Sequence, residues 1–256
     1  MVQKRNKSSQ KINIPESQVV IIGRHPVLEA LSGDRRSYHL HLQKDIQGDL
    51  IDQVISLAQK QGVPVSFYDK KEMDRCVKGN HQGFILMAEP INYATLDDLF
   101  DIAEERQEVP FFVLLDGLED PHNLGAILRT ADAAGVHGII IPSRRAVGLT
   151  STVVKTAAGA AEHVRVVQVT NMARTIEELQ DRGVWVFGTD MAGEDYRQWN
   201  SAGPIAIVIG SEGKGISRLV KEKCDGLVTI PMKGHVQSLN ASVAAALLMY
   251  EVARKR

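Results

Sequence analysis

The stretch FFVLLDGLEDPHNLGAILRTADAAGVHGIIIP, residues 111–142, decides the fold of this chain. It opens with an apolar run, continues with a helical pattern over 124–135, and ends in a second apolar run. Apolar strands joined by helices are typical of a parallel sheet with helices on both faces. We therefore expect an α/β domain over residues 109–256. Further apolar runs predict more of its strands at 164–169, 184–190, 204–210 and 227–232.

A smaller α/β unit is expected ahead of this domain, over residues 18–91. Its predicted elements are three strands and one helix, at 19–23, 64–68, 83–88 and 48–62. The segment 92–108 carries one Lys or Arg against six Asp and Glu and is bounded by prolines, so it predicts a short helical linker. Residues 1–17 are basic and polar, which predicts a disordered arm.

Composition narrows the class of protein. The 256 residues are 44% hydrophobic and 24% charged, with a net charge of −1, which argues against a strongly basic nucleic-acid binder but permits a local basic patch. Two distant cysteines, Cys76 and Cys224, indicate neither a disulfide framework nor a cysteine metal site and favour a cytoplasmic setting. The histidines show no ligand spacing, so we predict no metal. The apolar run 241–253 is about 13 residues long, whereas a membrane span needs about 20, so it predicts a buried helix and no membrane association.

Polar loops follow the apolar strands of the larger domain. In parallel α/β sheets, ligands bind outside the carboxyl ends of the strands, so we expect a site there. No GxGxxG follows the first strand of either unit, and GSEGKGIS lacks the residue order of a phosphate loop. The loops concerned are DGLEDPHN (116–123), FGTDMAG (187–193), IGSEGKG (209–215) and IPMKGHVQSLN (230–240).

Each polar residue in these segments has two interpretations. Asn123 is well placed as a helix N-cap, and Arg129 falls away from the apolar stripe; both are either ordinary structural residues or groups that face a site. Glu212 lies among three glycines, which either make a turn or bring the backbone close to a ligand. Ser238 and Asn240 either cap the last helix or join the same site. The residues alone leave these alternatives open.

Together the segments resemble the SpoU family of RNA ribose 2'-O-methyltransferases, within the SPOUT class. GRHPVLEAL (23–31) and HQGFILM (81–87) are similar to the small RNA-binding domain of its rRNA-modifying branch, so the resemblance covers nearly all of residues 18–256. Three blocks match the family's motifs in order and separation: DGLEDPHNLGAILRTADAAGVHGIII (116–141), IAIVIGSEGKGISRLV (205–220) and VTIPMKGHVQSLNASVAAALLMYEVAR (228–254).

The resemblance implies a parallel sheet with a C-terminal trefoil knot and S-adenosylmethionine as methyl donor to a ribose 2'-oxygen. The catalytic residues that it implies are Asn123, Arg129, Glu212, Ser238 and Asn240. The cofactor-binding residues that it implies are Gly188, Thr189, Gly210, Glu212, Gly213, Ile230, Met232, Ser238, Leu239 and Asn240. Arg129 is a candidate base, but a guanidinium stays protonated in proteins. Arg129 therefore either holds a substrate phosphate while a phosphate or water accepts the hydroxyl proton, or Glu212 accepts that proton.

The resemblance also implies a homodimer and an RNA partner, most closely a guanosine of large-subunit ribosomal RNA. Transfer RNA methylation and a non-catalytic RNA-binding protein on the same fold remain the alternatives. Because the chain is near neutral, RNA binding requires a local basic face. We expect it to be formed by the N-terminal arm with Arg24, Arg35, Arg36, Arg144 and Arg145.

Overall fold

The computed structural model describes residues 15, 18–33, 35–77 and 79–256. The chain forms two compact units, Met1–Pro90 and Ile91–Arg256. The predicted arm, residues 1–17, lies outside the described residues except for Pro15.

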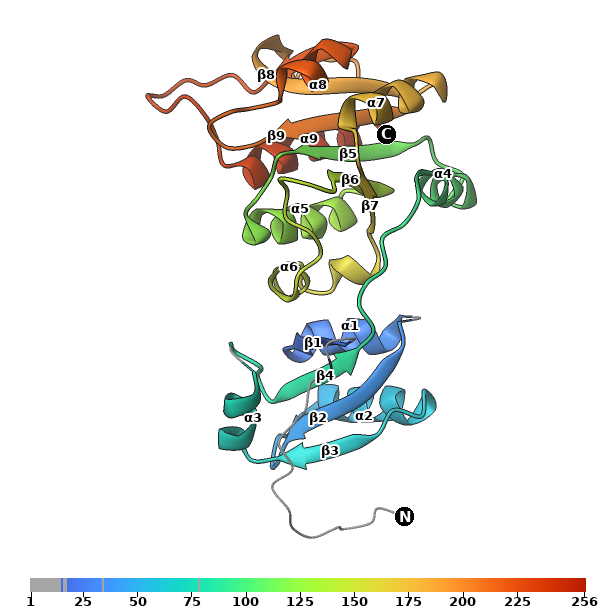
Figure 1. The fold of residues 1–256 in the computed structure, drawn as a ribbon, viewed down its shortest axis with the longest axis vertical. Helices are drawn as coiled ribbons and strands as arrows, with labels where there is room; N and C mark the ends of the chain where they lie inside the picture. Colours follow the sequence, from blue (N-terminus) through green and yellow to red (C-terminus); the bar gives the residue numbers. More distant parts are fainter. Residues whose placement is uncertain (1–14, 16–17, 34, 78) are drawn as a thin grey trace. The chain divides into compact units, whose positions relative to one another are not determined.

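The first unit is built on a four-stranded mixed sheet in the order β1-β4-β2-β3 (Figure 1). β4 is antiparallel to both β1 and β2, whereas β3 is parallel to β2. Its elements are β1 (Val19–Ile22), α1 (Arg24–Ser32), β2 (Ser37–Gln43), α2 (Asp49–Lys60), β3 (Val65–Tyr68), α3 (Lys70–Cys76) and β4 (Phe84–Ala88). The predicted strands and helix of this unit are all present, and β2 is an additional strand that the apolar runs did not indicate.

The second unit is a six-stranded parallel sheet in the order β10-β8-β9-β5-β6-β7. Its strands are β5 (Phe111–Asp116), β6 (Gly138–Pro142), β7 (Arg165–Val169), β8 (Trp185–Asp195), β9 (Ile205–Gly210) and β10 (Gly226–Thr229). Its helices are α4 (Leu96–Glu105), α5 (Pro121–Ala133), α6 (Ser151–Thr156), the 3-10 turn η1 (Ala160–Glu162), α7 (Met172–Asp181), α8 (Arg218–Lys223) and α9 (Ala241–Lys255). The parallel α/β domain predicted from the sequence is therefore confirmed, whereas the trefoil knot stays a prediction.

Helices cover both faces of the parallel sheet. On one face, α4, α7 and α8 share a buried core with the strands, to which they contribute Leu99, Ile176 and Val220. On the other face, α5 contacts α6, η1 and α9, and α9 also contacts β9. The central strands are buried on both sides, which explains their near-continuous apolar sequences.

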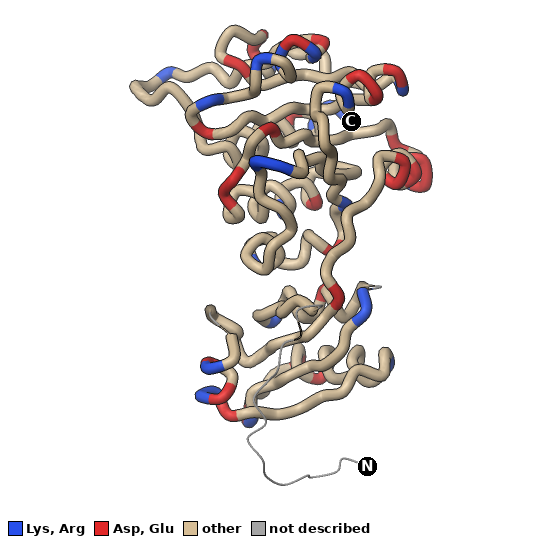
Figure 2. The backbone as a smooth tube through the Cα atoms, in the orientation of Figure 1, with Lys and Arg blue, Asp and Glu red and all other residues tan. Residues whose placement is uncertain are grey.

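The acidic segment 92–108 is part of the second unit. It forms α4, whose Leu99 is fully buried and whose Ala103 is 1% exposed. Its acidic residues are exposed, and Figure 2 shows Asp and Glu positions along that helix. The short helix predicted over 92–108 is therefore present as α4, and its apolar stripe is buried against the sheet.

Candidate active site

The carboxyl ends of β5 and β9 lie side by side. The two strands pair in parallel from Phe111 and Ile205 to Asp116 and Gly210, so they end at the same level. Asp116 Oδ2 accepts a hydrogen bond of 2.7 Å from the backbone N–H of Ser217, which ties the loop after β9 to the end of β5. The loops that leave these strands are therefore held next to each other.

Helix α5 begins earlier than the sequence predicts. Asp120 is its N-cap, with Oδ1 accepting from the backbone N–H of His122 at 2.9 Å, and Pro121 is the first helical residue. A proline suits that position because its missing N–H would have no helical partner. Of the two interpretations of Asn123, capping of the helix is therefore excluded. Asn123 lies in the first turn, 7% exposed, with its amide free to bond other segments.

A tight hairpin follows β9. The backbone N–H of Ser211 donates to the carbonyl of Gly215 at 3.1 Å, and the N–H of Gly215 donates back at 2.9 Å. Gly213 and Gly215 have φ angles of 89° and 65°, which side chains disfavour. A Cβ on Gly210 would lie 2.1 Å from the carbonyl carbon of Gly215. Glycine at these positions lets the chain turn back closely enough to hold Glu212 in the hairpin.

Three predicted catalytic residues meet beside this hairpin. Glu212 Oε1 accepts hydrogen bonds from Asn123 Nδ2 at 3.0 Å and from Asn240 Nδ2 at 2.6 Å. The same oxygen accepts from the backbone N–H of Ala241 at 3.2 Å. Asn240 Nδ2 also donates to Asn123 Oδ1 at 2.9 Å. The structure thus joins one residue from each of the three motif blocks in a single hydrogen-bond network.

Asn240 also fixes the start of α9. Its Oδ1 accepts from the backbone N–H groups of Ser242 and Val243 at 3.0 and 3.4 Å, so it is the N-cap. Capping and site interpretations therefore both apply to Asn240, because its oxygen caps the helix while its nitrogen joins Glu212. Ser238 is exposed in the preceding loop, and among the described residues its hydroxyl has no hydrogen-bond partner.

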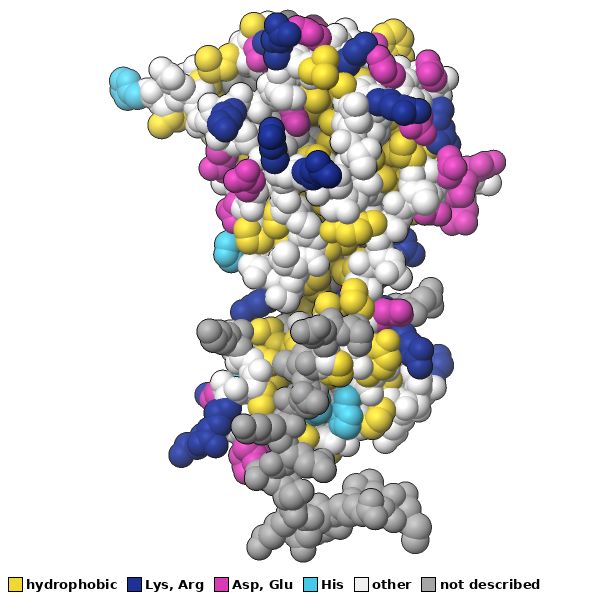
Figure 3. All heavy atoms as spheres, in the orientation of Figure 1, with side chains coloured by type: hydrophobic (Ala, Val, Ile, Leu, Met, Phe, Trp, Pro, Cys, Tyr) yellow, Lys and Arg dark blue, Asp and Glu magenta, His cyan; other side chains and the backbone are white. Residues whose placement is uncertain are grey.

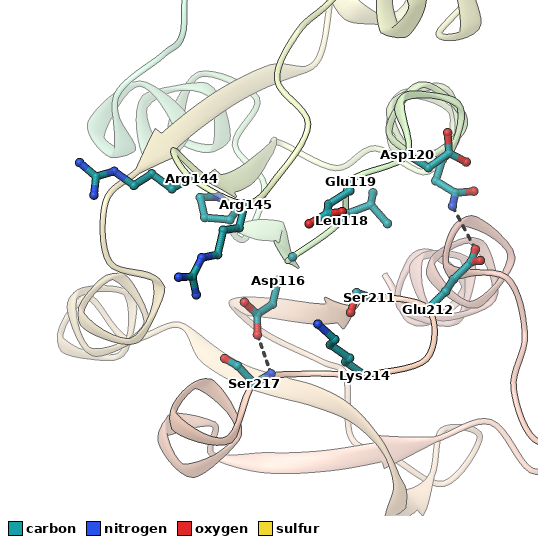
Figure 4. A pocket seen from close by; sticks show the side chains of 14 residues that line it. Asp116, Leu118, Glu119, Asp120, Arg144, Arg145, Ser211, Glu212, Lys214 and Ser217 are labelled. Atoms are coloured by element: carbon teal, nitrogen blue, oxygen red, sulfur yellow. Dashed lines mark hydrogen bonds between the residues drawn. The ribbon is translucent and has the colours of Figure 1, made fainter.

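A cavity of about 610 Å³ opens at the same edge of the sheet (Figure 4). Asn123 and Glu212 lie in its wall, together with two of the predicted RNA-binding arginines, Arg144 and Arg145. Its other lining residues are Asp116, Gly117, Leu118, Glu119, Asp120, Pro142, Ser211, Lys214, Gly215 and Ser217. Among the described residues, the sequence-based prediction missed the charged groups Asp116, Glu119 and Lys214, although all three occur in the strand-end loops that it singled out.

Arg129 lies apart from this cavity. It is exposed on α5, and among the described residues no carboxylate pairs with its guanidinium. With no described carboxylate paired to it, the group is available to an external anion.

The other predicted cofactor residues lie at the ends of three adjacent strands, β10, β8 and β9. Gly188 pairs with Leu227 of β10, but the next pair is Glu194 with Val228, so residues 189–193 leave the ladder. A Cβ on Gly188 would meet the side chain of Ile216 at 2.9 Å. Thr189 Oγ1 donates to the carbonyl of Val208 at 3.0 Å, so its side chain ties this excursion to β9.

This arrangement fits a flat, polar cofactor better than a metal ion. The excursion 189–193 and the loops with Gly210, Gly213, Ile230, Met232 and Leu239 offer backbone N–H and C=O groups and apolar side chains. Such groups can hold S-adenosylmethionine through the edge and faces of its adenine. Within the described part of the chain, no cluster of three or more His, Cys, Asp or Glu is arranged to hold a metal ion.

A charged pair flanks the same excursion. Lys221 Nζ donates to Asp190 Oδ2 at 2.7 Å, and this hydrogen bond lowers the pKa of Asp190. Burial raises the pKa of the nearby Cys224 thiol to about 12, helped by Asp225 and Asp116. Asp190 is therefore ionised and paired at neutral pH, whereas Cys224 is a neutral thiol.

The remaining predicted RNA-binding arginines lie in the first unit. Arg24 and Arg36 are exposed, with guanidinium carbons 5.9 Å from the Phe84 ring and 5.3 Å from the Tyr38 ring. Arg35 is partly buried and donates from Nε to the carbonyl of Glu89. In the second unit, Lys and Arg side chains are interspersed with Asp and Glu on the face shown in Figure 3. Among the described helices, none is long and apolar enough to cross a membrane.

Two family profiles match the two units. That of the SpoU rRNA methylase family matches residues 110–250, and that for RNA 2'-O ribose methyltransferase substrate binding matches residues 20–94. A Bacillus subtilis protein named as a TrmH family tRNA/rRNA methyltransferase, YacO, is 56% identical over 92% of this chain and 95% of its own length. A Staphylococcus aureus protein with the same family name is 49% identical over 93% and 96%.

Solved structures share the fold. An AdoMet-bound rRNA methyltransferase from Sinorhizobium meliloti is 27% identical, covers 93% of this chain and 88% of its own, and has a TM-score of 0.78. The A. aeolicus TrmH/SpoU tRNA modifying enzyme is 28% identical, with a TM-score of 0.53, over 62% of this chain and 84% of its own. The family and cofactor predicted from the motif blocks are confirmed. The chain therefore belongs to the SpoU family of RNA ribose 2'-O-methyltransferases, which use S-adenosylmethionine.

Proposed function

We propose that this protein methylates the ribose 2'-hydroxyl of one guanosine in large-subunit ribosomal RNA. The observation that carries the proposal is the hydrogen-bond network of Asn123, Glu212 and Asn240. These residues come from separate motif blocks, and two of them line a cavity large enough for a nucleotide. Polar side chains held together beside a cavity of this size favour an enzyme over a protein that uses the fold only to bind RNA.

S-adenosylmethionine supplies an already activated methyl group, so the protein's own tasks are to orient the ribose and to accept the hydroxyl proton. Asn123 and Asn240 fix the Glu212 carboxylate through one of its oxygens, Oε1. Its other oxygen, Oε2, is then available to the 2'-hydroxyl, and we assign Glu212 as the group that orients this hydroxyl and accepts its proton. The exposed guanidinium of Arg129 remains charged and lies outside the cavity, so it holds a phosphate of the RNA substrate beyond the target ribose.

The two-unit architecture favours ribosomal RNA over transfer RNA. The S. meliloti rRNA methyltransferase aligns with 93% of this chain, whereas the A. aeolicus tRNA modifying enzyme aligns with only 62%. The difference between these two shares is close to the length of residues 20–94, which match the substrate-binding profile. A substrate that needs the first unit is therefore the better candidate, and transfer RNA is the second, because the B. subtilis relative is named for both.

We further propose a cytoplasmic homodimer that contacts RNA through Arg24, Arg36, Arg144 and Arg145. The partial burial of Arg35 and its bond to Glu89 assign it a smaller share of phosphate contact than its neighbours. Binding should weaken as salt increases, because each phosphate contact releases counterions.

The test is transfer of labelled methyl from S-adenosylmethionine to unmodified 23S rRNA, 16S rRNA and total tRNA, followed by mapping of the modified nucleotide. We expect incorporation at one guanosine of 23S rRNA. Incorporation into tRNA alone would support the second candidate. Cofactor binding by calorimetry without transfer to any RNA would contradict the enzymatic proposal.

A further inference from the structure

The cavity beside the network carries charges of both signs. Asp116, Glu119 and Asp120 come from the end of β5 and the start of α5. Arg144 and Arg145 come from the loop after β6, and Lys214 comes from the hairpin after β9. A simple anion would meet carboxylates here, and a simple cation would meet guanidinium groups. The complementary ligand has an anionic end and a hydrogen-bond-donating end.

Arg145 and Lys214 are cationic side chains of the cavity that come from two different loops. Arg145 has a φ of 56°, a conformation uncommon for a residue with a side chain. Its guanidinium extends toward Asp116, whereas that of Arg144 extends away from the other labelled side chains (Figure 4). Among the described residues, neither Arg145 nor Lys214 has a salt-bridge partner. Both therefore remain available for a phosphate group.

Among the carboxylates that line the cavity, Glu119 is the one with both oxygens free of hydrogen bonds to the described residues. Asp116 Oδ2 is already engaged by the backbone N–H of Ser217, and Asp120 Oδ1 caps α5. Glu119 is exposed, and no hydrogen bond engages it within the described part of the chain. Its two oxygens can accept two parallel hydrogen bonds from one ligand edge.

Among nucleobases, guanine matches such a carboxylate best. Its Watson–Crick edge has two adjacent donors, N1–H and the N2 amino group. Adenine and cytosine each place one amino donor beside an acceptor nitrogen. Uracil places its single N3–H between two carbonyls, which a carboxylate repels.

We propose that this cavity seats the target nucleotide, with Glu119 accepting from N1–H and N2–H of guanine while Arg145 and Lys214 hold the adjacent phosphate. The inference rests on the proposed function and adds the residues that select the base. Asn123 and Glu212 line the same cavity, so a nucleotide held at both ends would present its ribose to the network.

Base selection is tested with Glu119→Gln. A glutamine amide offers one acceptor and one donor, which matches N3–H and O4 of uracil and places a donor opposite a donor of guanine. Once the modified position is mapped, transcripts with G, A, C or U there are methylated and the 2'-O-methylnucleosides are quantified by mass spectrometry. We expect the wild type to prefer G over U strongly, and Glu119→Gln to reduce that ratio roughly tenfold or more. Glu178→Gln, which changes an exposed carboxylate on α7, is the matched control.

Phosphate contact is tested separately from activity. Lys214→Met and Arg145→Met should each weaken RNA binding and lower the slope of log Kd against log salt by about one. Arg174→Met on α7 should leave the slope unchanged. Circular dichroism checks that each variant is folded.

Different results would contradict the proposed methyltransferase function and the proposed nucleotide contacts. Absence of methyl transfer to any RNA contradicts the proposed function. Transfer that maps to a base other than guanine, or a G/U ratio that Glu119→Gln leaves unchanged, overturns the assignment of Glu119 while the enzymatic function stands. Unchanged salt slopes for both Lys214→Met and Arg145→Met overturn the phosphate assignment.

Discussion

Asn123 on α5 donates a hydrogen bond of 3.0 Å to Glu212, which lies 89 residues further along the chain. The contact exists because β5 and β9 are neighbours that end level with each other. The glycine-rich hairpin then brings Glu212 toward the first turn of α5. A long-range contact between two polar side chains is therefore set by backbone geometry, which makes it sensitive to changes in either segment.

Removing the carboxylate should cost both stability and activity. In Glu212→Ala, the N–H donors of Asn123, Asn240 and Ala241 lose their common acceptor. Donors left without a partner in a partly buried site cost about 1–3 kcal/mol, so we expect a loss of that order in urea denaturation. Glu212→Gln keeps an acceptor oxygen and should recover most of the stability but little methyl transfer. Full transfer by Glu212→Gln would exclude Glu212 as the proton acceptor.

Removing the Arg129 guanidinium should reduce activity without reducing stability. It is exposed and makes no ion pair with the described residues, so Arg129→Ala should change the unfolding free energy by less than about 0.5 kcal/mol. We expect methyl transfer to fall by roughly a hundredfold or more, because an RNA phosphate is no longer held and the 2'-hydroxyl is misplaced. Calorimetry should find cofactor affinity within a few fold of the wild type. A collapse of cofactor binding would instead make the role of Arg129 structural, and Arg174→Ala serves as the control for loss of one surface charge.

The sequence predicted the second unit well for a physical reason. Strands buried on both faces are almost wholly apolar, so they stand out without any structure. β2 in the first unit was missed because His39 and His41 interrupt its apolar residues, and only the sheet shows that these rings share one face. The helix within 92–108 was predicted, but its packing on the sheet was not, because its charge is conspicuous whereas its buried stripe of Leu99 and Ala103 is short.

Some residues of the site were also predicted from the sequence, and others were not. The motif blocks identified Asn123, Glu212 and Asn240, but their bonds depend on which strands are neighbours, which the sequence does not state. Lys214 and Glu119 were missed because a single charged residue in a loop is ordinary unless a cavity is seen beside it.

Replacing Gly210 should displace the hairpin. A Cβ there would lie 2.1 Å from the carbonyl carbon of Gly215, so Gly210→Ala forces the backbone apart. Overpacking of this kind costs about 1–3 kcal/mol, and the shift should also pull Glu212 from Asn123. Thermal denaturation and methyl-transfer assays should both show a loss. Gly33→Ala is the control, since its φ is −86° and the nearest atom to its Cβ would be 3.7 Å away.

Acidification should destabilise the protein through His41. Burial, followed by the stacked ring of His39 at 4.4 Å, lowers the pKa of His41 from 6.5 to about 4. Between these two values the unfolded chain takes up a proton that the folded chain does not, so the unfolding free energy decreases as the pH falls from 6.5 to 4. NMR titration should place the His41 midpoint near 4. His41→Leu should flatten this part of the pH profile, and a midpoint near 6.5 would contradict the assignment.

The last helix should form the interface between two copies of the chain. Val243, Leu247 and Tyr250 are 48%, 38% and 53% exposed, and their spacing of four and three residues places them on one face of α9. The opposite face buries Leu248 and Val252, so both sides of the helix are apolar.

We therefore expect the 28.1 kDa chain to sediment as a dimer, and Leu247→Glu with Tyr250→Glu to sediment as a folded monomer. Methyl transfer should fall as well, because Asn240, the N-cap of α9, is in the site. Leu219→Glu on α8, a residue 56% exposed, should stay dimeric. A monomeric wild type at micromolar concentration, or a double variant that remains dimeric, would exclude this face as the interface.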